Sequence, residues 1–172
     1  MTTDRLSWAY GQLVFLIMMM AASYFFEYVV KLTPCALCVV QRLLIACLMV
    51  NALWVIWRVR RNMHIRGLQV VASIFAMLGL LVAWRHIWLQ QHADLMANAA
   101  CLPDIRFMLK MMPLPEVVMR LFSHGGAECS KIKWQFLGLT MPGWVAISYV
   151  IYTVQVIKLW LVDAQSKVDN LA

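Results

Sequence analysis

Four long apolar stretches, separated by shorter polar segments, dominate the pattern along this chain. They cover about residues 8–30, 37–57, 68–89 and 144–162. A bilayer core about 30 Å thick is crossed by roughly 20 apolar residues in a helix, and each stretch is about that long. The pattern therefore predicts an all-α fold, an integral membrane four-helix bundle with a long loop between the third and fourth helices.

The first stretch also has features of a secretory signal, because Arg5 precedes it and it contains the small residues Ala21 and Ala22. The apolar region of such a signal spans only about 7–15 residues. Since this run is longer and continues to Val30, we expect a membrane helix that is retained.

Composition agrees with a membrane protein. The chain has 172 residues, of which 63% are hydrophobic and 13% are charged, and its mean hydropathy is +0.74. Soluble domains carry about 25% charged residues. Because the apolar stretches take up about half of the chain, we expect residues 1–172 to form a single membrane domain without a second, soluble domain.

The net charge of +7 is unevenly distributed. The short link at 58–67 contains four arginines: Arg58, Arg60, Arg61 and Arg66. By the positive-inside rule this link is cytoplasmic, and with four helices both termini are cytoplasmic too. The loops at about 31–36 and 90–143 then lie outside. Because the charge marks membrane orientation, we do not expect a nucleic-acid partner.

The predicted topology separates the five cysteines of the chain. Cys35 and Cys38 fall in the first outer loop, and Cys101 and Cys129 in the second. Cys47 falls inside the second helix and is interpreted as a buried apolar residue. The four outer cysteines allow three pairings, of which Cys35–Cys38 with Cys101–Cys129 is the simplest.

The Cys35-x-x-Cys38 pair is better suited to redox exchange than to stapling. A bridge across two residues closes a very small loop, and the entropic gain of a disulfide grows with loop length. For Cys101 and Cys129, in a long loop, a structural staple is a serious alternative. Four cysteines also form zinc sites, but the second pair lacks the short spacing of such sites, so we predict no metal.

The residues around Cys38 favour a reactive thiolate. If the second helix begins near Ala36, Cys38 lies in its first turn, where unpaired N–H groups stabilise negative charge. Arg42 lies one turn further on the same face. Two interpretations of Arg42 remain: it supports an anionic Cys38 or a quinone carbonyl, or its side chain reaches outward to lipid phosphate.

Two other polar residues are predicted near the same membrane face. His86 follows Trp84 at the end of the third helix; it donates to a quinone, acts as a proton relay, or belongs to an interfacial belt of Trp, Arg and His. Glu27 lies near the outer end of the first helix, and either pairs with Lys31, four residues on, or assists proton uptake. Within the long outer loop, segments 105–112 and 117–122 are expected to form short helices on the membrane surface.

Three elements together resemble the DsbB family, the disulfide bond formation protein B of bacterial inner membranes. They are the Pro34-Cys35-Ala36-Leu37-Cys38 motif with Arg42, the spacing of Cys101 and Cys129, and the run from Trp134 to Trp144 entering the fourth helix. The resemblance covers essentially the whole chain.

The resemblance implies a relay of thiol–disulfide exchange on the periplasmic side. A soluble thioredoxin-fold oxidase of the DsbA type is the implied partner, and its reduced cysteine attacks Cys101 of a Cys101–Cys129 disulfide. Cys129 then attacks Cys35 and frees Cys38 from a Cys35–Cys38 disulfide. The partner leaves oxidised and supports disulfide formation in exported proteins.

The resemblance also implies a membrane quinone, ubiquinone or menaquinone, as the electron acceptor. Cys38 passes the electrons to it, and Arg42 and His86 lie near its carbonyls. The chain is then a quinone-dependent protein-dithiol oxidoreductase of the bacterial inner membrane.

Two rival functions remain. The first is a structural or assembly protein whose outer cysteines are inert staples. The second is a quinone reductase of the vitamin K epoxide reductase type, although in that family the loop cysteine pair precedes the Cys-x-x-Cys motif, whereas here Cys101 and Cys129 follow it. A transporter is disfavoured because the apolar stretches contain few ionisable residues.

Overall fold

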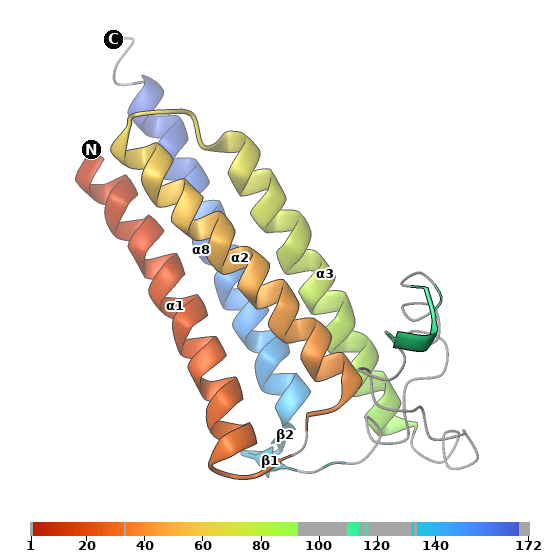
Figure 1. The fold of residues 1–172 in the computed structure, drawn as a ribbon. Helices are drawn as coiled ribbons and strands as arrows, with labels where there is room; N and C mark the ends of the chain where they lie inside the picture. Colours follow the sequence, from red (N-terminus) through yellow and green to blue (C-terminus); the bar gives the residue numbers. More distant parts are fainter. Residues whose placement is uncertain are drawn as a thin grey trace.

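The structure is a computed structural model and describes residues 2–32, 34–92, 110–113, 116, 132 and 134–168. Its four long helices run alternately up and down the bundle (Figure 1). They are α1 (Thr2–Tyr28), α2 (Ala36–Arg60), α3 (Arg66–Gln91) and α8 (Met141–Val168). All four are long and apolar enough to cross a membrane. The prediction of an all-α, four-helix membrane bundle is confirmed.

Each helix differs from its apolar stretch mainly at the ends. α1 begins at Thr2 and α8 continues to Val168, so both helices extend beyond their apolar stretches into polar residues. Backbone hydrogen bonds continue a helix whether its side chains are apolar or polar. α1 ends at Tyr28, before Lys31 adopts the left-handed conformation with φ 56°. The polypeptide then turns toward the start of α2.

The link between α2 and α3 is short and well hydrogen-bonded. Asn62 adopts φ 51°, a left-handed conformation that asparagine tolerates better than most residues. The amide of Met63 donates to the carbonyl of Arg58 at 3.0 Å, so the end of α2 closes as a compact turn. This link lies at the same end of the bundle as both termini, opposite the α1–α2 connection (Figure 1).

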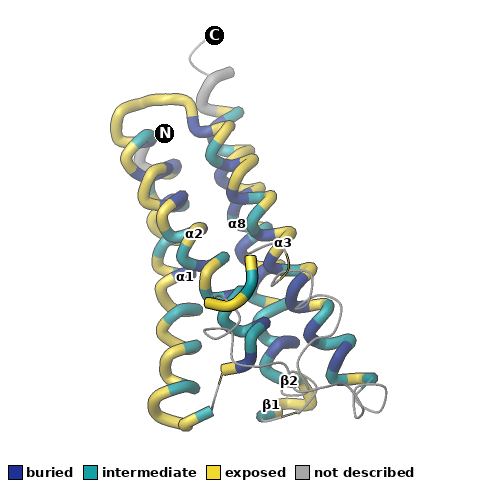
Figure 2. Tube along the Cα trace, turned by 45° about the vertical axis from the view of Figure 1, so that its right-hand side comes forward, coloured by how far each residue is buried: buried dark blue, intermediate teal, exposed yellow. Residues whose placement is uncertain are grey.

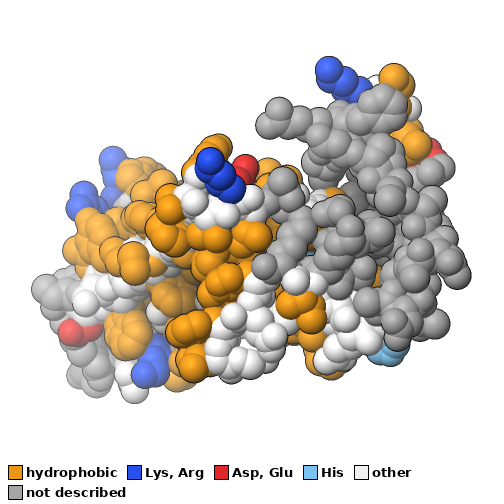
Figure 3. Space-filling view, turned by 90° about the horizontal axis from the view of Figure 1, so that it is seen from below, with side chains coloured by type: hydrophobic (Ala, Val, Ile, Leu, Met, Phe, Trp, Pro, Cys, Tyr) orange, Lys and Arg blue, Asp and Glu red, His pale blue; other side chains and the backbone are white. Residues whose placement is uncertain are grey.

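Buried side chains face the centre of the bundle and exposed ones face outward (Figure 2). Leu16, Leu48 and Tyr152 are fully buried at the centre. Hydrophobic side chains also cover much of the described surface seen from below (Figure 3). A soluble protein rarely exposes so large an apolar surface, so this surface is suited to contact with lipid chains.

α3 and α8 approach each other closely at Gly79. A Cβ atom at this position would lie 2.3 Å from ring atoms of Tyr149 in α8. Glycine is therefore required for the observed packing of the aromatic ring against α3. The Tyr149 hydroxyl donates to the carbonyl of Gln41 in α2, at 3.3 Å, so this one side chain contacts two neighbouring helices.

A buried ion pair joins the first and last helices near the two termini. Arg5 in α1 contacts the carboxylate of Asp163 in α8, and both side chains are largely shielded from solvent. The pair lies at the end of the bundle that holds the arginine-rich link (Figure 1).

A small hairpin precedes α8. Strands β1 (Gln135–Phe136) and β2 (Leu139–Thr140) pair antiparallel, and the turn residues Leu137 and Gly138 have φ 51° and 78°. Positive φ at both central residues is typical of the type I′ hairpin turn. This hairpin was not predicted from the sequence. The predicted surface helices at 105–112 and 117–122 lie largely outside the described residues.

Candidate functional site

The Cys-x-x-Cys motif lies at the beginning of α2. Cys35 is the N-cap residue, with an extended backbone (φ −77°, ψ 167°), and the helix starts at Ala36. Pro34 precedes this start, where its lack of an N–H costs no helical hydrogen bond. Cys38 therefore occupies the first turn, beside N–H groups that have no partner within the helix. This helical start agrees with the one expected from the sequence.

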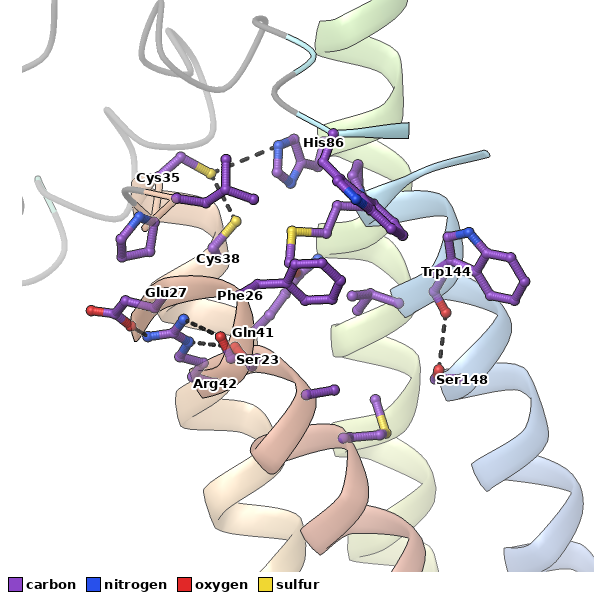
Figure 4. Close-up of a pocket in the computed structure, with 18 of the residues that line it drawn as sticks. Ser23, Phe26, Glu27, Cys35, Cys38, Gln41, Arg42, His86, Trp144 and Ser148 are labelled. Atoms are coloured by element: carbon purple, nitrogen blue, oxygen red, sulfur yellow. Dashed lines mark hydrogen bonds and ion pairs between the residues drawn. The ribbon is translucent and has the colours of Figure 1, made fainter. Parts of the chain in front are cut away.

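The two cysteine sulfurs and a histidine form a close cluster. The Sγ atoms of Cys35 and Cys38 are 3.0 Å apart, and Cys35 Sγ lies 3.7 Å from Nε2 of His86 (Figure 4). A disulfide bond measures about 2.05 Å, so the cysteines are present as two thiols. Cys38 is the more accessible of the two, since Cys35 is buried.

His86 comes to this cluster from α3, across the bundle. Its side chain is buried, with 4% of the residue exposed, whereas Trp84 is 69% exposed. His86 is therefore placed inside the bundle and not in an exposed aromatic belt. Its predicted contact with a quinone stays a prediction.

A cavity of about 410 Å³ adjoins the cluster, at the end of the bundle where α2 begins. Its walls are mainly apolar and include side chains such as Met19, Ile45 and Val145. The polar residues that line it are Ser23, Glu27, Cys35, Cys38, Gln41, Arg42, His86, Gln90 and Ser148. The structure thus brings Cys38, Arg42 and His86, which are 48 positions apart at most, to one cavity.

An aromatic cluster closes one side of this cavity. Its members are Phe26, Trp134, Phe136 and Trp144. The rings of Phe26 and Trp134 are 4.8 Å apart, and those of Trp134 and Phe136 are stacked at 5.9 Å. Trp144 Nε1 donates to the carbonyl of Phe136 at 3.2 Å. The run from Trp134 to Trp144 was noted in the sequence, but its aromatic residues were not predicted to belong to the site.

Arg42 is held by three contacts with α1. Its Nε donates to Ser23 Oγ at 2.6 Å, a second nitrogen donates to the Ser23 carbonyl at 3.0 Å, and a third forms an ion pair with Glu27. The guanidinium also lies 5.1 Å from the centre of the Tyr24 ring. Figure 4 shows Arg42 directed toward Ser23 and Glu27. Its predicted role toward Cys38 or a quinone stays a prediction.

The partner of Glu27 differs from the one suggested by the sequence. The described residues show Glu27 paired with Arg42 in α2, and not with Lys31. The i, i+4 pairing would require a continuous helix, but α1 ends at Tyr28, before Lys31. Ser23 was missed, and the only signal for it was its position one turn before Glu27.

The remaining cysteines are placed as follows. Cys47 was interpreted as buried, but it is exposed on the outside of α2. A small apolar side chain suits the lipid-facing side of a membrane helix as well as its core, so apolar character alone did not distinguish the two. Cys101 and Cys129 lie outside the described residues, and their roles stay predictions.

Comparison with known proteins agrees with the resemblance described above. The family profile "Disulfide bond formation protein DsbB" matches residues 4–159. Proteins named disulfide bond formation protein B are similar over most of their length. The one from Nitrosococcus oceani is 32% identical over 83% of this chain and 82% of its own. The one from Marinobacter nauticus is 34% identical over 83% of this chain and 84% of its own.

These matches reach well beyond the cysteine motif and span all four helices, since the profile begins in α1 and ends in α8. They support a role in disulfide bond formation and favour it over a purely structural protein. The chain therefore belongs to the DsbB family of disulfide bond formation proteins.

Proposed function

We propose that this chain reoxidises a soluble, periplasmic dithiol oxidase of the DsbA type and passes the electrons to a membrane quinone. Membership of the disulfide bond formation family supports the thiol–disulfide part of this proposal. The observation that carries the proposal is the position of the Cys35–Cys38 pair at the wall of an apolar cavity near the end of a membrane bundle.

The residues around the cavity fit a quinone headgroup. A flat, apolar ring suits walls that include Phe26, Trp134 and Trp144, and the volume of about 410 Å³ lies within the usual range for small-molecule sites. Quinone carbonyls accept hydrogen bonds, and Arg42 and His86 are two of the donors that line the cavity with Cys38. When bound, the quinone supplies an acceptor for two electrons and two protons.

The chain's own residues would perform the exchange of disulfides. A thiolate of the reduced partner attacks Cys101 of a Cys101–Cys129 disulfide, and Cys129 leaves as a thiolate. Cys129 then attacks Cys35 of a Cys35–Cys38 disulfide, and Cys38 leaves. The start of α2 stabilises negative charge on Cys38, which makes Cys38 the better leaving group of the pair.

His86 is placed to handle a proton at the other sulfur. Its Nε2 lies 3.7 Å from Cys35 Sγ, so the imidazole can hold or accept a proton beside this sulfur during the exchange. The same contact orients Cys35 within the cluster.

The arrangement of the bundle supports a membrane topology for this function. The arginine-rich link and both termini lie at one end of the bundle, and the Cys35–Cys38 pair lies at the other (Figure 1). By the positive-inside rule, the first end is cytoplasmic and the dithiol faces the periplasm of a bacterial inner membrane. This topology places the redox pair on the oxidising side.

The decisive experiment measures quinone reduction by the purified protein with a reduced partner. Cys38→Ser should abolish turnover while the protein still inserts into membranes. Cys47→Ser is the matched control, because Cys47 lies in the same helix but faces outward, and its turnover should match the parent chain. Normal turnover in Cys38→Ser would contradict the proposed route of electrons.

A second variant separates the two cysteine pairs. Cys101→Ser should block the attack of the partner but leave quinone binding unchanged. If Cys101→Ser lost quinone binding instead, the two sites would not be separate, and the proposed order of exchange would be wrong. If turnover required neither cysteine pair, a structural or assembly role for this chain would be favoured instead.

A further inference from the structure

The cluster of Cys35, Cys38 and His86 has the composition of a metal site. The two sulfurs and one imidazole nitrogen all lie within 4.8 Å of one another. Thiolate sulfur and imidazole nitrogen are the preferred ligands of Zn²⁺ and related d¹⁰ cations. The prediction of no metal rested on the four outer cysteines as the only candidate ligands. His86, 51 positions after Cys35, completes a different set.

The distances within the cluster are close to those of a tetrahedral zinc site. Zn–S bonds of about 2.3 Å and Zn–N bonds of about 2.0–2.1 Å place ligand atoms roughly 3.6 Å apart for S and N, and roughly 3.8 Å for two sulfurs. Cys35 Sγ and His86 Nε2 are 3.7 Å apart, which already matches. The two sulfurs are 3.0 Å apart, so Cys38 Sγ needs to move outward by less than about 1 Å.

The charges in the cluster also suit a divalent cation. Two thiolates and one neutral imidazole around a divalent ion sum to zero, so no net charge is placed beside the apolar cavity. Arg42 would repel a bare cation, but its charge is balanced by Glu27. A neutral complex is therefore favoured here over two negatively charged sulfurs beside the apolar cavity.

Three protein ligands leave a fourth position open, as in catalytic zinc sites. Gln90 follows His86 by one helical turn and lines the same cavity. Its Oε1 is buried and forms no hydrogen bond with any residue in the described part of the chain. Either this oxygen or a water molecule in the cavity can complete a tetrahedral set.

We propose that the reduced chain binds one thiophilic divalent cation, such as Zn²⁺ or Cd²⁺, through Cys35 Sγ, Cys38 Sγ and His86 Nε2. Binding replaces the two thiol protons with the ion and involves no electron transfer. The bound ion occupies the sulfur lone pairs that would form the disulfide, so it holds the pair in the reduced state. The disulfide form has no thiolate to offer, so the site exists only after reduction.

The test uses the full-length chain with Cys101→Ser and Cys129→Ser, reduced with a phosphine and free of quinone. Cd²⁺ is titrated in, and the ultraviolet absorption of cadmium–thiolate bonds reports binding. We expect one ion per chain, displacement by Zn²⁺, and no absorption after the Cys35–Cys38 pair is oxidised.

Variants test the three ligands. Cys38→Ser should abolish the absorption, and His86→Ala should weaken Cd²⁺ affinity at least about tenfold, which corresponds to about 1.4 kcal/mol. His92→Ala is the matched control, because His92 lies at the end of the same helix and stacks on Trp88 outside the cluster, and its affinity should be unchanged.

Three results would overturn this proposal. They are equal binding by the oxidised chain, undiminished affinity in a folded His86→Ala variant, and no binding by a reduced chain whose circular dichroism is native. Because the titration contains neither quinone nor partner, its failure leaves the proposed oxidase function untouched. Conversely, loss of turnover in the oxidase assay does not affect the metal measurement.

Discussion

The guanidinium of Arg42 in α2 forms an ion pair with the carboxylate of Glu27 in α1, at the edge of the cavity that Cys38 also lines. Ser23 adds two further hydrogen bonds to the same guanidinium. A charged arginine within an apolar helix is costly without a partner. The ion pair with Glu27 offsets this cost and fixes the position of Arg42 relative to α1.

Replacing Glu27 should therefore affect the cavity through Arg42. In Glu27→Gln the counter-charge is lost, and we expect the apparent KM for quinone to rise about 5- to 30-fold, equivalent to about 1–2 kcal/mol. Steady-state kinetics at saturating reduced partner measure this value. Lys31→Gln is the control, since Lys31 is not the partner of Glu27, and it should leave KM unchanged.

Arg42 itself provides a separate test. Arg42→Ala should raise the apparent KM for quinone by at least about tenfold, because one charged donor is removed from the cavity. Arg85→Ala is the comparison, since Arg85 stacks on Trp88 and does not line the cavity. An unchanged KM in Arg42→Ala would show that Arg42 serves only the helix pair.

The contact between Gly79 and Tyr149 predicts that alanine has opposite effects on stability at two glycine positions, Gly79 and Gly11. Gly79→Ala should lower the free energy of unfolding by about 1–3 kcal/mol, because the Tyr149 ring must move to admit a methyl group. Gly11→Ala should raise it by up to about 1 kcal/mol, since nothing lies within 4 Å of that position and alanine favours helix. Thermal unfolding in detergent compares the two variants.

The ion pair between Arg5 and Asp163 predicts strong coupling between the terminal helices. Asp163→Ala should destabilise the bundle by about 3–5 kcal/mol, because it leaves Arg5 buried without its counter-charge. The double variant Arg5→Met with Asp163→Leu should be close to the parent chain in stability. Additive losses in a double-mutant cycle would contradict this coupling.

The membrane topology is testable with single added cysteines in a chain whose own cysteines are replaced by serine. Met63→Cys, in the exposed α2–α3 link, should react with an impermeant thiol reagent only after the inner membrane is opened. Leu137→Cys, at the exposed tip of the hairpin, should react in intact spheroplasts. The reverse pattern would place the Cys35–Cys38 pair in the reducing cytosol and contradict the proposed function.

The sequence predicts the helices well, because an uninterrupted apolar run in a bilayer must satisfy its backbone hydrogen bonds internally, and a helix does so. It also predicts the start of α2, since Pro34 and the Cys35-x-x-Cys38 motif mark the end of a turn. These features are local, and local rules identify them. The observed start of α2 at Ala36 agrees with that reasoning.

Features that depend on packing between helices were not predictable in the same way. Local spacing offered Lys31 as the partner of Glu27, whereas the structure pairs Glu27 with Arg42, 15 positions away. Likewise, the approach of His86 to Cys35 depends on the position of α3 relative to α2 along the bundle axis. The periodicity of side chains in the sequence does not specify this position. The hairpin at 135–140 was missed because Leu137 is an unusual residue at positive φ.

The aromatic cluster has a consequence for the reach of the second cysteine pair. Trp134 contacts Phe26 and stacks on Phe136, and Cys129 precedes it by five residues. A chain of five residues extends at most about 18 Å. In the proposed exchange, this five-residue connection limits the distance between Cys129 and Trp134, so chain length alone would raise the local concentration of Cys129 around Cys35.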